Sequence, residues 1–112
     1  MRWGAFFLLG VLALALQASA AQYYISPLGS DSNNGTSEQS PFLTLSKALN
    51  ASSSGDSINA ATGNYTGSEN VGLSVVDRTI SGASTSGTVF EGDNSDPFST
   101  SGAVVFENLT LK

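Results

Sequence analysis

The chain contains neither cysteine nor histidine among its 112 residues. Disulfide bonds are therefore excluded, as are the Ser-His-Asp and Cys-His arrangements that activate a catalytic nucleophile. The usual zinc sites also depend on these two residue types. Small secreted domains commonly supplement a small core with disulfides or a metal ion. Without either, we expect an unusually regular fold or a chain that is a piece of a longer protein.

Positive charge is scarce as well, with four Lys and Arg against nine Asp and Glu. Such a surface does not suit nucleic acid, whose phosphates attract basic residues. The sequence has no phosphate-binding loop and no dinucleotide fingerprint, so no cofactor is predicted.

Residues 1–20 have the layout of a secretory signal peptide. A positive start at Met1-Arg2 precedes the apolar run Ala5–Leu16, and Ala18–Ala20 supplies a small-x-small cleavage site. The run is too short to span a bilayer, although an N-terminal anchor is the alternative reading. We predict cleavage after Ala20 and a mature domain of residues 21–112. That domain would be extracellular or at the cell surface, without a stable membrane span.

The mature part is rich in Ser, Thr, Gly and Asn, which is typical of disorder or of a turn-rich all-β protein. Its apolar residues are bunched into short runs, which favours the second class. Strands are expected at Gln22–Ser26 and Asp56–Ala61, and the alternating pattern of Val71–Val75 indicates a half-buried strand. Ser30–Gln39 is predicted to be a polar loop, and Gly63-Asn64 a turn.

One short helix is expected after this loop. Ser40 is the predicted N-cap and Pro41 the first helical residue. A single apolar stripe follows at Phe42, Leu45, Ala48 and Leu49, and Ser52–Gly55 ends the helix. So short a helix is not stable alone in water, so its stripe must dock on other elements.

Three four-residue segments share one form: Thr79–Gly82, Val89–Gly92 and Val105–Asn108. Each has a β-branched residue, an apolar residue, a polar residue and then Gly or Asn. Because Gly and Asn enter the left-handed region at low cost, each copy is predicted to be a strand that runs into a sharp corner. The spacing of 26 residues from Gly82 to Asn108 suits one coil of a β-solenoid.

Several motifs together resemble the start of pectate-lyase-like right-handed parallel β-helix proteins. In style they are also similar to extracellular polymorphic-membrane-protein-like repeat proteins. The motifs are Tyr24–Pro27, Gly29–Asp31, Asn34–Thr36, Pro41–Leu45, Lys47–Leu49, Gly55–Ile58, Gly63–Tyr65 and Phe106–Leu111. The resemblance implies an all-β fold, a right-handed parallel β-helix (pectin lyase fold) whose core is covered at its start by a strand and a short capping helix.

This fold serves many unrelated activities, so it does not define the function. The leading hypothesis is a structural or interaction module that contacts extracellular proteins or polysaccharide. The alternative is the N-terminal piece of a polysaccharide-active lyase, esterase or hydrolase. Such lyases use basic residues in middle coils, so we assign no catalytic residue and expect no activity from this chain alone. The sequence stops after a strand without a second cap, which predicts an incomplete solenoid or a last coil that pairs with a partner.

Two oxygen-rich loops are candidate calcium sites. In Asp31–Gly35 the closing Glu is replaced by Phe42, and a solvated turn is the simpler reading. The loop containing Asp93 and Asp96 has better ligands, but surface acidic loops more often bind no metal. No metal site is assigned.

Four Asn-x-Ser/Thr triplets predict N-glycosylation if the source is eukaryotic; the acceptors are Asn34, Asn50, Asn64 and Asn108. Asn34 and Asn64 are expected in loops and are the best acceptors, whereas Asn108 suits a corner.

Two further groups of side chains are candidates for contact with sugars. Glu91 and Glu107 hold equivalent places in two repeat copies, so stacked coils could bring their carboxylates together for glycoside hydrolysis, or both could point to solvent. Four aromatic residues could form a sugar-stacking platform, although core packing is their more frequent role: Tyr23, Tyr24, Phe42 and Tyr65.

Overall fold

In a computed structural model, which describes residues 20–92 and 98–112, the protein consists mostly of strands with one short helix. The strands are β1 (Gln22–Ile25), β2 (Ser57–Ala60), β3 (Gly63–Tyr65), β4 (Leu73–Val76), β5 (Thr79–Gly82), β6 (Thr88–Phe90), β7 (Phe98–Ser101), β8 (Val105–Glu107) and β9 (Thr110–Leu111). The helix, α2, spans Leu45–Ala51. The prediction of an all-β protein is therefore confirmed.

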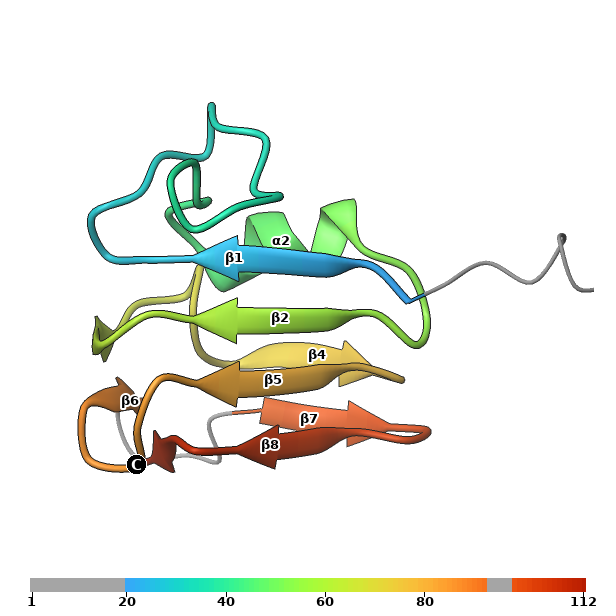
Figure 1. Cartoon of the computed structure of the whole chain (residues 1–112). Helices are drawn as coiled ribbons and strands as arrows, with labels where there is room; N and C mark the ends of the chain where they lie inside the picture. Colours follow the sequence, from blue (N-terminus) through green and yellow to red (C-terminus); the bar gives the residue numbers. More distant parts are fainter. Residues whose placement is uncertain (1–19, 93–97) are drawn as a thin grey trace, which may run out of the picture.

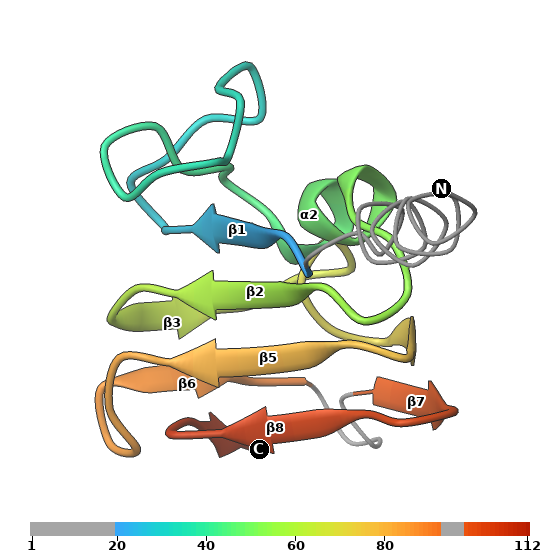
Figure 2. The same cartoon turned by 45° about the vertical axis from the view of Figure 1, so that its right-hand side comes forward.

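The strands form three short sheets, and every pair of neighbours is parallel. Their orders are β1-β2-β5-β8, β3-β6-β9 and β4-β7. The first sheet lies across the front in Figure 1, with β4 and β7 behind it. β3 and β6, which Figure 2 labels just below β2 and β5, pair with each other in the second sheet. The chain thus visits the sheets in a recurring order.

The first sheet shows the alternation expected of a strand with one buried face. Its central inward row is Tyr23, Ile58, Ile80 and Phe106, which are register partners on successive strands. Ile58 and Ile80 are fully buried, whereas Tyr23 and Phe106, at the two ends, are half-buried. An inward residue of this row is therefore fully buried where its strand has a paired strand on both sides.

Aromatic rings fill the space between the sheets. Tyr65 stacks on Phe90 with ring centroids 4.6 Å apart, and Phe90 meets the edge of Phe98 at 5.6 Å. Phe98 in turn stacks on Phe106 at 5.2 Å. These contacts join all three sheets into one core, because the four rings come from β3, β6, β7 and β8.

The β1 end of the stack is covered by α2 and the loops before it, which lie above β1 in both views. We call this region, residues 26–51, the lid. Its residues Phe42, Leu45 and Ala48 are buried against the strands. The predicted docking of an apolar stripe is confirmed, with Leu49 packed at its margin.

The predicted start of the helix was wrong. Thr44, not Ser40, is the N-cap, and its side chain accepts a hydrogen bond from Lys47 N at 3.2 Å. Phe42 stays extended because it bridges Ile25 in parallel and its N–H donates to Tyr24 O at 2.8 Å. Pairing with β1 thus overrides the local Ser-Pro signal and delays the helix by one turn. The end is as predicted, with Ser52 as C-cap.

Two further backbone predictions need correction. Gly63 and Asn64, expected in a turn, belong to β3, where they pair with Thr88 and Val89. Among the predicted left-handed corners, Asn108 has φ +55°, but Gly82 does not have a positive φ. Gly82 instead serves close packing, since a Cβ there would overlap the backbone oxygen of Asn108.

Within residues 20–92 and 98–112, no helix has the length and apolar character needed to cross a bilayer. The predicted signal peptide lies, apart from Ala20, outside the described residues.

Candidate binding groove on the first sheet

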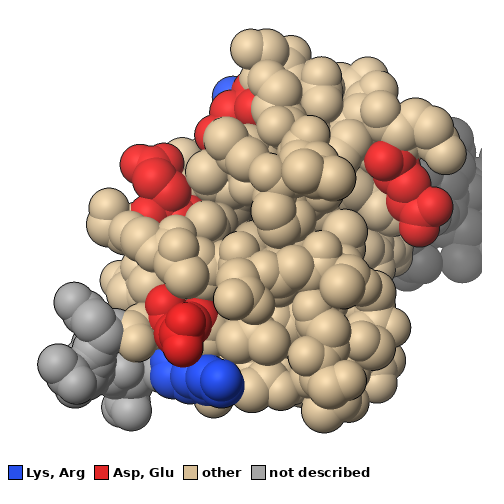
Figure 3. Space-filling view, turned by 90° about the vertical axis from the view of Figure 1, so that its left-hand side faces the viewer, with Lys and Arg blue, Asp and Glu red and all other residues tan. Residues whose placement is uncertain are grey.

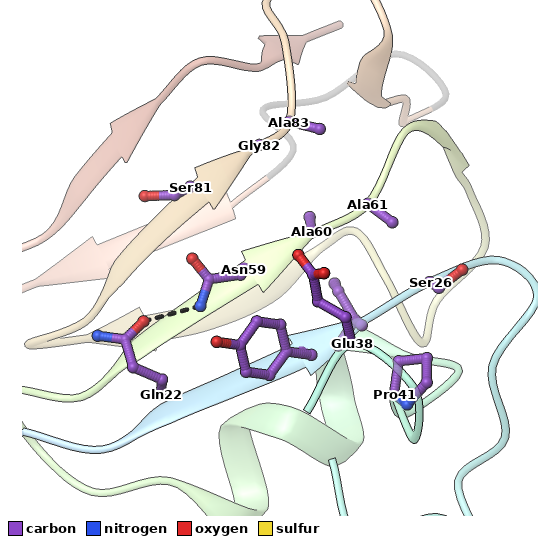
Figure 4. A pocket seen from close by; sticks show the side chains of 12 residues that line it. Gln22, Ser26, Glu38, Pro41, Asn59, Ala60, Ala61, Ser81, Gly82 and Ala83 are labelled. Atoms are coloured by element: carbon purple, nitrogen blue, oxygen red, sulfur yellow. Dashed lines mark hydrogen bonds between the residues drawn. The ribbon is translucent and has the colours of Figure 1, made fainter. Parts of the chain in front are cut away.

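A hollow of about 580 Å³ opens on the outer face of the first sheet, near the ends of β1, β2 and β5. The lid loop that follows β1 forms one wall (Figure 4). Its lining residues are Gln22, Tyr24, Ile25, Ser26, Glu38, Pro41, Asn59, Ala60, Ala61, Ser81, Gly82 and Ala83. We call this hollow the groove.

The floor of the groove is a row of outward-facing residues, one from each strand. Tyr24 is the register partner of Asn59, and Asn59 is the partner of Ser81. The row continues through Ser81 to Glu107 on β8. Neighbouring parallel strands lie ~4.8 Å apart, so the row presents polar groups at a regular interval.

Hydrogen bonds hold the Asn59 and Ser81 side chains of this row. Asn59 Nδ2 donates to Gln22 Oε1 at 2.8 Å, a bond that is drawn in Figure 4, and to Tyr23 O at 3.3 Å. Farther along, Ser81 Oγ donates to Glu107 Oε1 at 2.7 Å. These two polar side chains are therefore held in place before any ligand arrives, which lowers the entropy lost on binding.

Two other kinds of group line the groove, one in the floor and one in the wall. Tyr24 brings an aromatic ring that is half-buried, and Glu38 brings a carboxylate from the loop between β1 and α2. The rest of the lining is amide, hydroxyl, backbone or small apolar surface. Such a groove offers a ring face and several hydrogen-bonding groups at low charge.

Charge is sparse around this part of the molecule. On the face shown in Figure 3, Asp and Glu lie in separate groups on a largely uncharged surface. The described residues contain no group of three His, Cys, Asp or Glu side chains that could hold a metal ion.

Of the two arrangements left open for Glu91 and Glu107, the stacked pair of carboxylates does not form, and both residues are exposed. Glu107 belongs to β8 of the first sheet, where its partner is Ser81. Glu91 follows β6 of the second sheet, and its N–H donates to Tyr65 O at 3.0 Å. The repeat copies therefore fall in different sheets and do not stack, so these carboxylates do not form a catalytic pair.

The Asp31–Gly35 loop turns out to brace the lid. One carboxylate oxygen of Asp31 accepts hydrogen bonds from the N–H groups of Leu43 and Thr44, at 2.9 and 3.0 Å. The other accepts from Thr44 Oγ1 at 2.9 Å. Asp31 thus fixes the backbone just before α2, and its oxygens are used within the protein. The other calcium candidate, Asp93 and Asp96, lies outside the described residues.

A second bracing carboxylate, Asp56, is buried just before β2. It accepts hydrogen bonds from Ala21 N at 2.9 Å and Ser53 N at 2.8 Å. These two bonds, with a smaller contribution from the Arg78 guanidinium, hold the pKa of Asp56 below its usual value. Asp56 therefore remains ionised and joins β1 to the end of the lid.

The four aromatic candidates divide between core and groove. Phe42 and Tyr65 are buried, and the Tyr65 hydroxyl donates to Ala61 O at 2.7 Å, while burial raises the pKa of the Tyr65 phenol. Tyr23 stacks on Phe42 at 6.2 Å. Tyr24 is the member of the four that lines the groove. The four rings therefore do not share one sugar-stacking platform, and core packing, their more frequent role, holds for Phe42 and Tyr65.

The four predicted acceptor asparagines are all exposed. Asn34 lies in the lid loop, and its Oδ1 accepts from Thr36 N and Thr36 Oγ1. Asn50 lies on α2 and Asn64 on β3 rather than in a loop. Asn108 occupies the corner after β8. Glycosylation at these sites stays a prediction.

Sequence reasoning missed the groove row, although a signal for it existed. Asn59, Ser81 and Glu107 each follow an apolar residue in short strand segments, Ser57–Ala60, Thr79–Gly82 and Val105–Asn108, and the last two share the repeat form. Aligning these segments would have placed the three side chains in one row. The contribution of Glu38 has no comparable signal, because the lid loop brings it to the groove from an irregular segment.

The fold and groove define an all-β protein with short parallel sheets and a polar outer row. A family model described as a protein of unknown function (DUF1565) matches residues 28–76, and this family is associated with parallel β-helix proteins. The match runs from the lid loop to the end of β4. No curated protein and no solved structure shows significant similarity to the chain.

Proposed function

We propose that this protein is a secreted or cell-surface module with the lid and first coils of a right-handed parallel β-helix, and that it binds polysaccharide in the groove. The recurring visits to three parallel sheets support the solenoid. Right-handed crossovers between parallel strands are the strong general rule, which supports the handedness.

The single observation that carries the binding proposal is the row Tyr24-Asn59-Ser81 beneath the Glu38 wall. Sugar rings stack their apolar faces on aromatic side chains, and their hydroxyl groups exchange hydrogen bonds with amides, hydroxyls and carboxylates. The row supplies both kinds of contact within one hollow. Its regular spacing along the sheet favours an extended chain over a single compact ligand.

The low charge of the groove favours a neutral polysaccharide. An anionic chain such as a polyuronate would bring its carboxylates close to Glu38, and like charges in a partly desolvated site repel. We therefore expect neutral oligosaccharides to bind and polyuronates to bind more weakly at low salt.

The proposal is tested by isothermal titration calorimetry of the secreted protein with neutral oligosaccharides and oligouronates of equal length. Tyr24→Ala is expected to lower affinity at least tenfold, because it removes the ring face. Asn59→Ala should lower it several-fold, because it removes a fixed donor and loosens Gln22. Asn64→Ala is the matched control, since Asn64 is exposed on β3 of another sheet.

Three results would contradict or redirect the proposal. Absence of binding to any saccharide, or an equal loss in the Asn64 control, would overturn binding in the groove. Cleavage of the added oligosaccharide would favour the polysaccharide-active enzyme instead. A circular dichroism spectrum like that of the parent protein shows that each variant is folded.

A further inference from the structure

Ala21, the first residue after the predicted signal peptidase site, already lies in the folded part of the protein. Its N–H donates to Asp56 Oδ1 at 2.9 Å, and its carbonyl oxygen accepts from Ser57 N at 3.0 Å. The next residue, Gln22, is the first of β1 and the register partner of Ser57. The preceding residue, Ala20, is exposed. The bond to be cleaved therefore lies directly beside the edge of the first sheet.

We propose that Asp56 is the receptor for the new N-terminus, so that cleavage of the Ala20–Ala21 bond creates an ion pair that fastens β1 to β2. Signal peptidase is the catalyst and water the co-reactant. The amide C–N bond breaks, the water oxygen bonds to the carbonyl carbon of Ala20, and Ala20 leaves as a carboxylate. The nitrogen of Ala21 takes up protons and becomes an α-ammonium.

The geometry needs little change for this to happen. The nitrogen that becomes charged is the atom already at hydrogen-bond distance from the carboxylate. The acceptor of this bond is already ionised, and cleavage adds a positive charge to the donor, so an attraction between opposite charges is added to an existing contact. Asp56 is buried, which lessens screening by solvent, and the N–H of Ser53 holds its other oxygen in place.

Arg78 is the charged neighbour that acts on this pair. The Arg78 guanidinium also acts on Asp56, and it would repel the ammonium. Arg78, however, is directed to Ser52, with Nε 2.8 Å from Ser52 Oγ and Nη2 3.1 Å from Ser52 O. The carboxylate is in direct contact with the Ala21 nitrogen, so its attraction outweighs the repulsion from Arg78.

The pH dependence follows from the signs of the two shifts. The folded ammonium has a raised pKa, so its contribution is complete below the unfolded value of ~7.7–8.0 and is lost as pH rises through the folded value. Asp56 has a lowered pKa, so its contribution is present above the unfolded value of ~3.9 and is lost as pH falls through the folded value. Maximum stabilisation is expected between about pH 4 and pH 8.

The experiment begins with secretion of the full 112-residue chain and N-terminal sequencing of the product. A second precursor, with two residues inserted between Ala20 and Ala21, yields a product whose Ala21 nitrogen is an amide and whose charge is moved outward. Urea denaturation compares the two products from pH 3 to pH 10. Nuclear magnetic resonance of the α-amino group gives its pKa.

We expect the natural product to begin at Ala21 and its amine pKa to rise by about one unit, which corresponds to a ~10-fold higher folding equilibrium constant near pH 6. Asp56→Asn should remove the difference between the two products. An unshifted amine pKa, equal stability of the two products at every pH, or cleavage at another bond would overturn the proposal.

Because the extended product keeps Asp56, the comparison still decides the question if Asp56→Asn does not fold. The proposal rests on the expected signal peptide but not on saccharide binding. Loss of saccharide binding with a shifted amine pKa would therefore contradict only the proposed function.

Discussion

The two ends of the strand stack carry similar apolar residues but cover them to different extents. At the lid end, Ile25 and Phe42 are 1% and 3% exposed. At the β8–β9 end, Leu111 is 39% exposed, although its register partner on β6, Phe90, is fully buried. The difference arises from what covers each end. The lid lies over β1, whereas β7, β8 and β9 are the outermost strands of their sheets among the described residues. Burial in this fold is therefore set by the neighbouring layer more than by residue type.

The largest expected effect comes from truncating the same ring type in the middle and at the end of the stack. Phe90 is fully buried between Tyr65 and Phe98, so Phe90→Ala should lower the free energy of unfolding by ~3–5 kcal/mol. Phe106 is stacked on Phe98 but only half-buried. Phe106→Ala should therefore lower the free energy of unfolding by less than half as much as Phe90→Ala. Urea denaturation measures both, and equal losses would show that the β8–β9 end is covered as well as the middle of the stack in solution.

An intermediate effect is expected from loosening the lid. Asp31→Ala removes three hydrogen bonds that fix the chain before α2, so we expect a loss of ~1–3 kcal/mol. Glu69→Ala removes an exposed carboxylate and should stay within about 0.5 kcal/mol of the parent. Faster amide exchange in α2 for the Asp31 variant alone would attribute the loss to the lid, and unchanged exchange would contradict that role.

The smallest effects compare two leucines on opposite ends. Leu28 is 95% exposed on the lid loop, so Leu28→Ser should change stability by less than about 0.5 kcal/mol. Leu111 pairs with Phe90 on β6 and keeps most of its surface covered, so Leu111→Ser should lower the free energy of unfolding by ~1 kcal/mol. Thermal melting followed by circular dichroism measures both, and the reverse order would contradict the exposure of the two leucines in the structure.

Much of the strand content could be predicted because alternation and corner residues are local signals. Ile58 and Val75 show this, since each is the buried member of a short alternating segment. The sheet to which each repeat copy belongs could not be predicted. The segments at Thr79 and Val105 share a sheet, but the similar segment at Val89 lies in another. A period of two indicates which face of a strand is buried and does not indicate which strands pair.

The groove was harder to predict than the fold. Tyr24 and Asn59 meet only because the whole lid is inserted between their strands, so no short-range pattern links them. The predicted start of α2 was wrong for a related reason. The Ser40-Pro41 signal is local, whereas the pairing of Phe42 with Ile25 is not. Long-range pairing decided each case.

The number of residues between successive strands of the first sheet has a consequence for how this sequence can evolve. Ser57 to Thr79 is a shorter step along the chain than Thr79 to Val105, yet both pairs keep the same register. The additional residues are accommodated between the strands, without shifting the outward row. Insertions in those links would therefore be tolerated without altering the spacing of Asn59, Ser81 and Glu107, so loop length and surface chemistry can evolve independently.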